Sequence, residues 1–314
     1  MVKLSLIKPS ELYNILNQRL NNAFVSDPYY AVLFGRDLIF SMSPFTDSRV
    51  SDDYQKSHII TAKNLKRLSS NVFRIPYEAE LDCKLHVIVY DGNTSSLKCE
   101  GEAVKAAEVL YDNGSYDGVK ILEGGFELFT RMYPFMRSEK VMYLPRELES
   151  FSTYPLEVLF NVLYMGTPQH AGDCKLHRQM NIEAHLNYAL DANEDPMYQS
   201  YKDSIFTIRK PDDDNDNLLL FFDDACDFIQ EKRLRGQRVL IVSKCLINQS
   251  VVIAIAYLIK YESMSLKDAW MYLRKVCLPM QPSWCYMVQL AEFECKLRNT
   301  DKPILLTEDE YYER

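Results

Sequence analysis

The sequence predicts an α/β protein of two domains, on three observations. Short apolar runs typical of buried strands alternate with amphipathic helical stretches, a pattern that favours parallel sheets. The chain has 314 residues, which is long for one hydrophobic core. A polar stretch divides the strands and helices into two sets. We therefore expect a first domain at residues 1–137, a linker at 138–152, a second domain at 153–300 and an acidic tail at 301–314.

The first set opens with a helix at residues 9–22. Pro9-Ser10-Glu11 is a helix start signal, and apolar residues follow it at helical spacing. The later elements, in chain order, are a short strand at 30–34, a buried strand at 85–90, a helix at 102–110 and a strand at 119–122. The turn Asp91-Gly92-Asn93 ends the buried strand, and Gly124-Gly125 closes the last one.

The second set is also a mixture of strands and helices. Its expected strands lie at 158–164, 184–189, 205–208 and 238–243, and its expected helices at 218–230, 251–261, 266–276 and 286–298. A short loop joins the buried strand at 238–243 to the apolar helix at 251–261. This junction is the most informative part of the chain.

Composition excludes several classes of function. Hydrophobic residues make up 47% and charged residues 25% of the chain, as in globular proteins. The net charge of −8 argues against binding to nucleic acid or to an anionic membrane surface. No apolar run reaches the roughly 18 residues that span a bilayer. The eight cysteines form no CxxC pair, and we do not read the five histidines as pairing with them in a zinc-ligand pattern. We expect reduced thiols, a cytoplasmic protein, no metal and no cofactor.

Residues 239–259 combine a buried strand, a loop and the start of an apolar helix. Such a junction can bind an anion because the first N–H groups of the helix point toward it. Cysteine-dependent phosphatases use this layout with the motif HCxxGxxR, usually followed by Ser. The Cys attacks as a thiolate, the Gly lets backbone amides converge on the phosphate, and the Arg grips two phosphate oxygens.

The second domain resembles the dual-specificity phosphatase family along most of its length. Four segments carry the resemblance in order: 153–167 is similar to the opening strands, 208–229 to the acid loop and its helix, 256–270 to the helix pair after the loop, and 282–294 to the closing pattern. Asp212 falls at the general-acid position. The resemblance implies a phosphatase-like sheet flanked by helices over residues 153–296.

The loop itself has lost the family pattern. Against the motif, the His is replaced by Val242, the Cys by Ser243, the Gly by Leu246 and the Arg by Gln249, and only Ser250 remains. A serine hydroxyl is un-ionised at neutral pH, and the Arg would have supplied two charge-assisted bonds of about 1.5–3 kcal/mol each. We therefore expect no catalytic residue and no enzyme activity. The degenerate loop comprises Val242, Ser243, Lys244, Cys245, Leu246, Ile247, Asn248, Gln249 and Ser250.

Two alternative readings of this loop stay open. A residual weak phosphatase could use Ser243 or Cys245, although a nucleophile shifted to Cys245 would need its Arg at the position of Val251. A phosphopeptide trap could instead use the helix amides together with Lys244.

The acidic run that holds Asp212 also resembles a calcium loop through Asp212, Asp214 and Asp216. In such a loop a Gly is needed where Asn217 stands, and a bidentate Glu where Asp223 stands. We therefore expect no metal there, and we read Asp212 as a relict of the general acid in a solvated loop.

The first domain resembles the rhodanese-like domain that precedes the catalytic domain in MAP-kinase phosphatases. Residues 52–65 carry the resemblance, and residues 85–92 and 120–129 fit its later strand, turn and Gly-Gly signature. Active rhodaneses open the loop with a Cys where this chain has Asp91, so no sulfur transfer is implied. Gly35-Arg36 stands where the family usually has Asp-x-Arg.

In MAP-kinase phosphatases the rhodanese-like domain docks kinases through adjacent arginines. The corresponding basic residues here are Lys63, Lys66, Arg67 and Arg74. Because they are spread out, a solvated basic face is the favoured reading and a kinase-docking site the second.

Two degenerate domains in one chain resemble the serine/threonine/tyrosine-interacting-like pseudophosphatases. This resemblance implies a non-enzymatic regulator or scaffold in signalling, with protein partners such as MAP kinases, phosphatases or stress-granule proteins, and an association with mitochondria. That group keeps the Gly and the Arg of the loop. This chain has lost both, so capture of phosphorylated residues does not follow from the resemblance.

Overall fold

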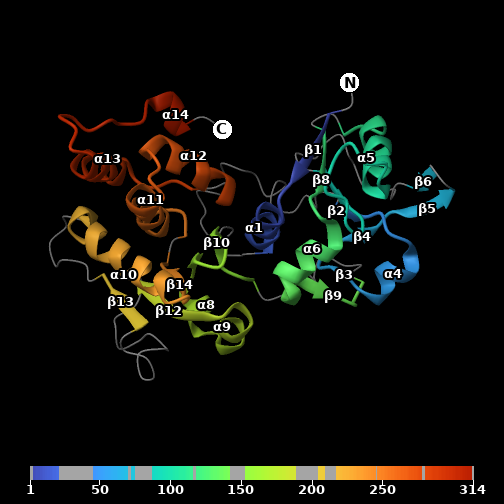
Figure 1. The fold of residues 1–314 in the computed structure, drawn as a ribbon, viewed down its shortest axis with the longest axis horizontal. Coiled ribbons are helices and arrows are strands. Elements are labelled where there is room, and N and C mark those ends of the chain that lie inside the picture. The colour runs from blue at the N-terminus through green and yellow to red at the C-terminus, as the bar shows by residue number, and fades with distance from the viewer. Residues whose placement is uncertain are drawn as a thin grey trace. The chain divides into compact units, whose positions relative to one another are not determined.

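The structure is a computed structural model that describes residues 3–20, 45–69, 72–74, 87–115, 118–141, 153–188, 204–208, 217–244, 246–277 and 280–312. The chain divides into two compact units, Met1–Ser152 and Thr153–Arg314. Each unit contains a five-stranded sheet with helices packed against it, as Figure 1 shows. The predicted α/β class is therefore confirmed.

The first unit is built on a parallel sheet of strand order β1-β8-β7-β2-β4. Its strands are β1 (Leu4–Ile7), β2 (Phe45–Asp47), β3 (His58–Ile59), β4 (Lys63–Asn64), β5 (Lys66–Ser69), β6 (Val72–Arg74), β7 (Val87–Tyr90), β8 (Val119–Leu122) and β9 (Arg137–Ser138). Its helices are α1 (Pro9–Leu20), α4 (Ser51–Lys56), α5 (Glu102–Asp112), α6 (Gly125–Met132) and the 3₁₀ helix η3 (Pro134–Met136). The pairs β3–β9 and β5–β6 are small antiparallel sheets outside the main one.

Small side chains let helix α5 approach this sheet closely. Ala103, Ala106 and Ala107 are fully buried and join one core cluster with strands β7 and β8. Helix α1 buries its apolar face, and the ring of Tyr13 stacks on that of Tyr133 with centroids 4.4 Å apart. Strand β1 had no counterpart in the sequence prediction, and the strand predicted at 30–34 lies outside the described residues.

The second unit has the strand order β10-β11-β14-β12-β13, in which β10 is antiparallel to β11 and the other pairs are parallel. Its strands are β10 (Leu156–Leu159), β11 (Leu163–Gly166), β12 (Ile182–Asn187), β13 (Ile205–Thr207) and β14 (Arg238–Val242). Its helices are α8 (Pro168–Gly172), α9 (Cys174–Met180), α10 (Phe222–Leu234), α11 (Gln249–Tyr261), α12 (Leu266–Val276), α13 (Trp284–Arg298), α14 (Glu308–Tyr312) and the 3₁₀ helix η6 (Leu218–Phe221).

The structure corrects three boundaries. The single strand predicted at 158–164 is wrong, because a turn with Asn161 at φ 57° separates β10 from β11. Helix α11 begins at Gln249, so the loop after β14 is shorter than predicted. The start of the predicted linker belongs to the first unit, because Ser138 pairs with His58 between β9 and β3.

Within the described ranges, no helix has the length and apolar character needed to cross a membrane.

Candidate functional site

The degenerate loop starts at the carboxyl end of β14, the central strand of the second sheet. The N–H of Ser243 donates to the carbonyl of Gly166 at the end of β11, over 3.1 Å, and the carbonyl of Val242 accepts the N–H of Tyr188 beyond β12, over 2.9 Å. Val242 and Ser243 are both fully buried. The residue at the position of the nucleophile is therefore held inside the fold between two neighbouring strands.

Two apolar side chains fold inward after this point. Leu246 is 3% exposed and Ile247 is 8% exposed. The hydroxyl of Ser250, in the first turn of α11, donates to the carbonyl of Leu246 over 2.8 Å. A loop that holds a phosphate turns amides toward the ligand and keeps side chains out of the way. Here Leu246 occupies the interior at the position where that motif has a glycine.

A segment distant in sequence, just before helix α13, also forms hydrogen bonds with the loop. The N–H of Gln281 donates to the carbonyl of Ile247 over 2.8 Å, and the N–H of Ser283 donates to Oδ1 of Asn248 over 3.2 Å. These bonds come from just before helix α13, and sequence reasoning missed them. They connect the loop to the C-terminal part of the second unit.

The other predicted loop residues are spread between surface and interior. Lys244 is exposed, Asn248 and Gln249 are half-buried, and Ser250 is fully buried. Cys245 and the general-acid position Asp212 lie outside the described residues.

The two flanking residues of the supposed calcium loop have other partners. Oδ1 of Asn217 accepts the N–H of Leu219 at the start of η6. Oδ1 of Asp223 lies 2.7 Å from Nζ of Lys260. Across the described ranges, no group of three or more His, Cys, Asp or Glu side chains is arranged to hold a metal ion.

One histidine comes closer to the loop than the sequence indicated. A Cβ atom at Gly166 would lie 3.0 Å from Nδ1 of His170, so the glycine permits the imidazole to approach the end of β11. Nδ1 of His170 accepts the N–H of Thr167, and Nε2 meets Oγ1 of Thr153. Burial lowers the pKa of His170 to about 4. Both ring nitrogens are thus engaged in capping α8 and in packing.

The corresponding loop of the first unit is filled by its own carboxylate. Asp91 follows β7, and its Oδ1 accepts the N–H groups of Asn93 and Thr94. Its Oδ2 accepts the hydroxyl of Thr94 over 2.6 Å and the N–H of Ala103 over 3.0 Å. Ala103 lies in the first turn of α5, so the carboxylate occupies a position at a helix N-terminus that favours anions.

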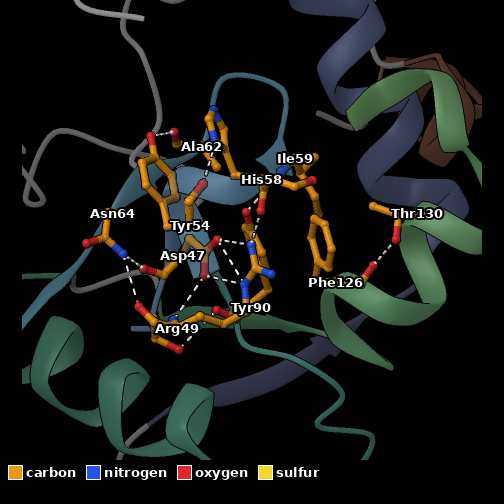
Figure 2. A network of polar contacts seen from close by, with 12 residues as sticks. Asp47, Arg49, Tyr54, His58, Ile59, Ala62, Asn64, Tyr90, Phe126 and Thr130 are labelled. Carbon is orange, nitrogen blue, oxygen red and sulfur yellow. Dashed lines mark hydrogen bonds and ion pairs between the residues drawn. The ribbon is translucent and has the colours of Figure 1, made fainter. Parts of the chain in front are cut away.

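A buried ion pair at the end of β2 organises the neighbouring edge of this sheet (Figure 2). Asp47 is fully buried, and its carboxylate receives Nε and Nη2 of Arg49, with the shortest distance 2.6 Å. Nη2 of Arg49 also donates to the carbonyl of Ser57 over 2.7 Å. The guanidinium lies 3.8 Å from the centre of the Phe126 ring. Burial and the nearby Asp47 raise the pKa of Tyr90 well above its ordinary value.

This pair supplies an Asp-x-Arg sequence that we did not predict here. We expected the position at Gly35-Arg36, which lies outside the described residues. Asp47 and Arg49 instead stand shortly before the Ser57-His58 segment, and Arg49 is eight residues from Ser57. The spacing to that segment was the signal that could have found it. The side chains of Asp47 and Arg49 bond to each other, and Arg49 also bonds to the backbone of Ser57. We therefore assign this pair a structural role.

The candidate docking residues lie on three short strands. Lys66 is paired in register with Arg74 across the β5–β6 sheet. Arg67 is paired with Phe73, and its Nη1 lies 2.6 Å from Oε2 of Glu102. Lys63 lies in β4 rather than in β5 or β6.

Comparisons with known proteins agree with this architecture. The family model for the catalytic domain of dual specificity phosphatases matches residues 163–296, and the model for the rhodanese-like domain matches residues 36–132. The chain therefore carries a dual specificity phosphatase-like domain and a rhodanese-like domain. The rhodanese-like domain lies in the first unit, and the phosphatase-like domain in the second.

Relatives match both domains at low identity. Human dual specificity protein phosphatase 16 is 26% identical over 277 residues, and the match covers 81% of this chain and 41% of that protein. Dual specificity protein phosphatase 8 of Mus musculus is 27% identical over 295 residues, covering 83% of this chain and 43% of that protein. A rhodanese domain-containing dual specificity protein phosphatase of Dictyostelium discoideum is 26% identical over 180 residues, covering 56% and 37%. The chain thus spans less than half the length of these relatives.

Among solved structures, human DUSP28 matches with a TM-score of 0.41 and 20% identity, over 47% of this chain and 97% of that chain. Human tyrosine phosphatase-like serine/threonine/tyrosine-interacting protein matches with a TM-score of 0.38 and 19% identity, over 46% and 97%. Likenesses this weak support no functional conclusion.

Proposed function

We propose that this chain is a catalytically inactive pseudophosphatase that acts as a protein-binding regulator or scaffold in phosphorylation signalling. The observation that carries the proposal is the apolar, hydrogen-bonded interior of the degenerate loop. The side chains of Leu246 and Ile247 are buried, and the N–H of Gln281 and the hydroxyl of Ser250 donate to loop carbonyls.

The chemistry of the loop supports the same proposal. By its match to the motif, Ser243 replaces the thiolate nucleophile, and its hydroxyl lacks the acidity that a thiol gains at a helix N-terminus. Gln249 replaces the Arg, which removes two charge-assisted bonds of about 1.5–3 kcal/mol each and lowers phosphate affinity on the order of 100-fold or more. Either loss alone suffices to abolish efficient turnover.

Hydrolysis of an aryl phosphate by the purified full chain tests this proposal against residual phosphatase activity. We expect no turnover above the buffer blank, and the same result for Ser243→Ala and Cys245→Ala. Turnover by the wild type that disappears in either variant would establish a residual enzyme. Comparison of the two variants shows which residue is the nucleophile. A contaminating phosphatase would be equally active in the wild-type and variant preparations.

The phosphopeptide trap is the second candidate, favoured by the exposure of Lys244 beside the start of α11. Titration of a phosphotyrosine peptide and of its unphosphorylated twin separates the two candidates. We expect equal, weak binding of both peptides, because Gln249 stands in place of the Arg that would grip the phosphate. Selective binding of the phosphorylated peptide that is lost in Lys244→Ala would instead support the trap.

The partners we propose are other proteins, with MAP kinases implied by the family resemblance. In the β5–β6 sheet Lys66 is paired in register with Arg74, while the side chain of Arg67 is paired with that of Glu102. If a kinase docks here, the double variant Lys66→Glu and Arg74→Glu weakens kinase binding more than Arg67→Glu does. Equal effects of the two changes would speak against docking through Lys66 and Arg74. A cytoplasmic location remains part of the proposal.

A further inference from the structure

The C-terminal segment of the second unit, residues 304–312, packs onto helices α12 and α13, and Figure 1 shows α14 beside α12. Leu306 is 5% exposed. The Tyr311 ring stacks on Trp270 with centroids 5.3 Å apart, and it meets the Trp284 ring edge to face at 5.4 Å. Trp270 is only 2% exposed, so this segment helps to shield it from solvent.

Polar contacts hold the same segment in place. The hydroxyl of Tyr311 donates to the carbonyl of Pro282 over 2.6 Å. Nε1 of Trp270 donates to the carbonyl of Glu310 over 3.1 Å, and Nζ of Lys267 lies 2.5 Å from Oε1 of Glu310. The segment is therefore a docked latch, which we define as residues 304–312, and Tyr311 is its centre.

The latch carries the sequence Glu308-Asp309-Glu310-Tyr311. Acidic residues before a tyrosine are a recurrent feature of tyrosine-kinase substrates. We propose that Tyr311 is a phosphorylation site for a protein-tyrosine kinase, and that its modification releases the latch from α12 and α13. The kinase gains access when the short helix α14 opens locally, as marginally stable terminal elements do.

The step is an ordinary phosphoryl transfer from ATP. The Oη atom of Tyr311 attacks the γ-phosphorus, so that a new O–P bond forms and the bond from the γ-phosphorus to the β,γ-bridging oxygen breaks. ADP leaves, and the phenolic proton passes to the base of the kinase. No electron is gained or lost.

The phosphorylated side chain does not fit the docked position. The phosphate oxygens have no proton to donate to the Pro282 carbonyl when the group is fully ionised, so the bond is replaced by repulsion between oxygens. The modification adds a charge of roughly −1.5 to −2 beside three acidic residues. Lys267, which contacts the latch, is already paired with Glu310.

Release of the latch would also affect the degenerate loop. Pro282, which accepts the Tyr311 hydroxyl, lies between Gln281 and Ser283. These two residues donate to Ile247 and Asn248 of the loop. The latch and the loop therefore share one short segment before α13.

The chain contains two tryptophans, Trp270 and Trp284, and both contact Tyr311. Intrinsic tryptophan emission therefore responds to the position of the latch. The full chain is incubated with a purified acid-directed tyrosine kinase and Mg-ATP, and phosphorylation of Tyr311 is followed by mass spectrometry. We expect the modified chain to emit at longer wavelength and to be quenched more strongly by acrylamide than the unmodified chain.

Two variants make the result specific. Tyr311→Phe keeps the aromatic stack and should show no emission change after kinase treatment, whereas Tyr312→Phe should respond like the wild type. Phosphorylated Tyr311 with an unchanged emission spectrum would overturn the release. Failure of the kinase to modify Tyr311 both in the full chain and in a peptide of residues 304–314 would overturn the assignment of the site.

Discussion

At the scale of single residues, the four replaced positions of the degenerate loop act together. Ser243→Cys restores a thiol but leaves Leu246 in the loop interior and Gln249 without a guanidinium, so we expect no measurable hydrolysis of an aryl phosphate. Adding Val242→His should not restore it either. Only the variant that also carries Leu246→Gly and Gln249→Arg regains the required groups. Turnover by Ser243→Cys alone would show that the loop is less degraded than its packing indicates.

The buried Asp47–Arg49 pair predicts a large loss of stability on single substitution. Asp47→Asn leaves the Arg49 guanidinium without its carboxylate, where side-chain exposure is 0% for Asp47 and 13% for Arg49. We expect the free energy of unfolding of the first unit to fall by about 3–5 kcal/mol, measured by urea denaturation with circular dichroism.

The matched control is Arg67→Ala, which breaks the exposed pair with Glu102, where the side chains are 32% and 40% exposed. Exposed pairs contribute about 0–1 kcal/mol, so this variant should unfold nearly as the wild type does. Equal losses in the two variants would contradict the structural role of the Asp47 carboxylate.

At the scale of elements, His170 makes the stability of α8 and its cap depend on pH. Burial lowers its folded-state pKa to about 4, below the ordinary value of roughly 6.5. Between these two values the unfolded chain binds a proton that the folded chain does not. Lowering the pH through this window therefore favours unfolding, by about 1.4 kcal/mol per pH unit for this group.

His170→Asn tests this dependence because its Oδ1 can replace Nδ1 as acceptor of the Thr167 N–H without titrating. The difference in unfolding free energy between wild type and variant should decrease as the pH falls from 6.5 to 4. A difference that is constant with pH would mean that the imidazole is not buried in its neutral form.

The Asp91 carboxylate caps helix α5 and closes the turn after β7. Asp91→Ala removes the acceptor of three backbone N–H groups and one hydroxyl. We expect a loss of about 1–3 kcal/mol in the unfolding free energy of the first unit. Asp91→Asn, which keeps one acceptor oxygen, should lose less. An unchanged midpoint for Asp91→Ala would refute the capping role.

At the scale of the whole molecule, the sequence predicted the helices and strands that have a clear local periodicity of apolar residues. The boundaries of β8 and α12 agree with prediction, because each element has clear apolar spacing and an end signal. The turn at Asn161 was missed since apolar residues continue on both sides of it. Strand β2 was missed because it is only three residues long.

The packing of the degenerate loop could not be predicted from local sequence periodicity. The identity of the replaced residues is visible in the motif, but the burial of Leu246 and Ile247 is a property of the folded second unit. The bond from Ser283 to Asn248 joins residues 35 positions apart. The docking of Tyr311 likewise depends on α12 and α13, and no local signal reveals it.

The central claim is that the turn between β14 and α11 no longer holds a phosphate-like dianion. Calorimetric titration of orthovanadate into the full chain tests it most directly, with the variant that combines Val242→His, Ser243→Cys, Leu246→Gly and Gln249→Arg as the reference. We expect saturable binding by that variant and none by the wild type. Saturable binding of vanadate by the wild type that is abolished by substitution at Lys244 or Ser243 would contradict the claim.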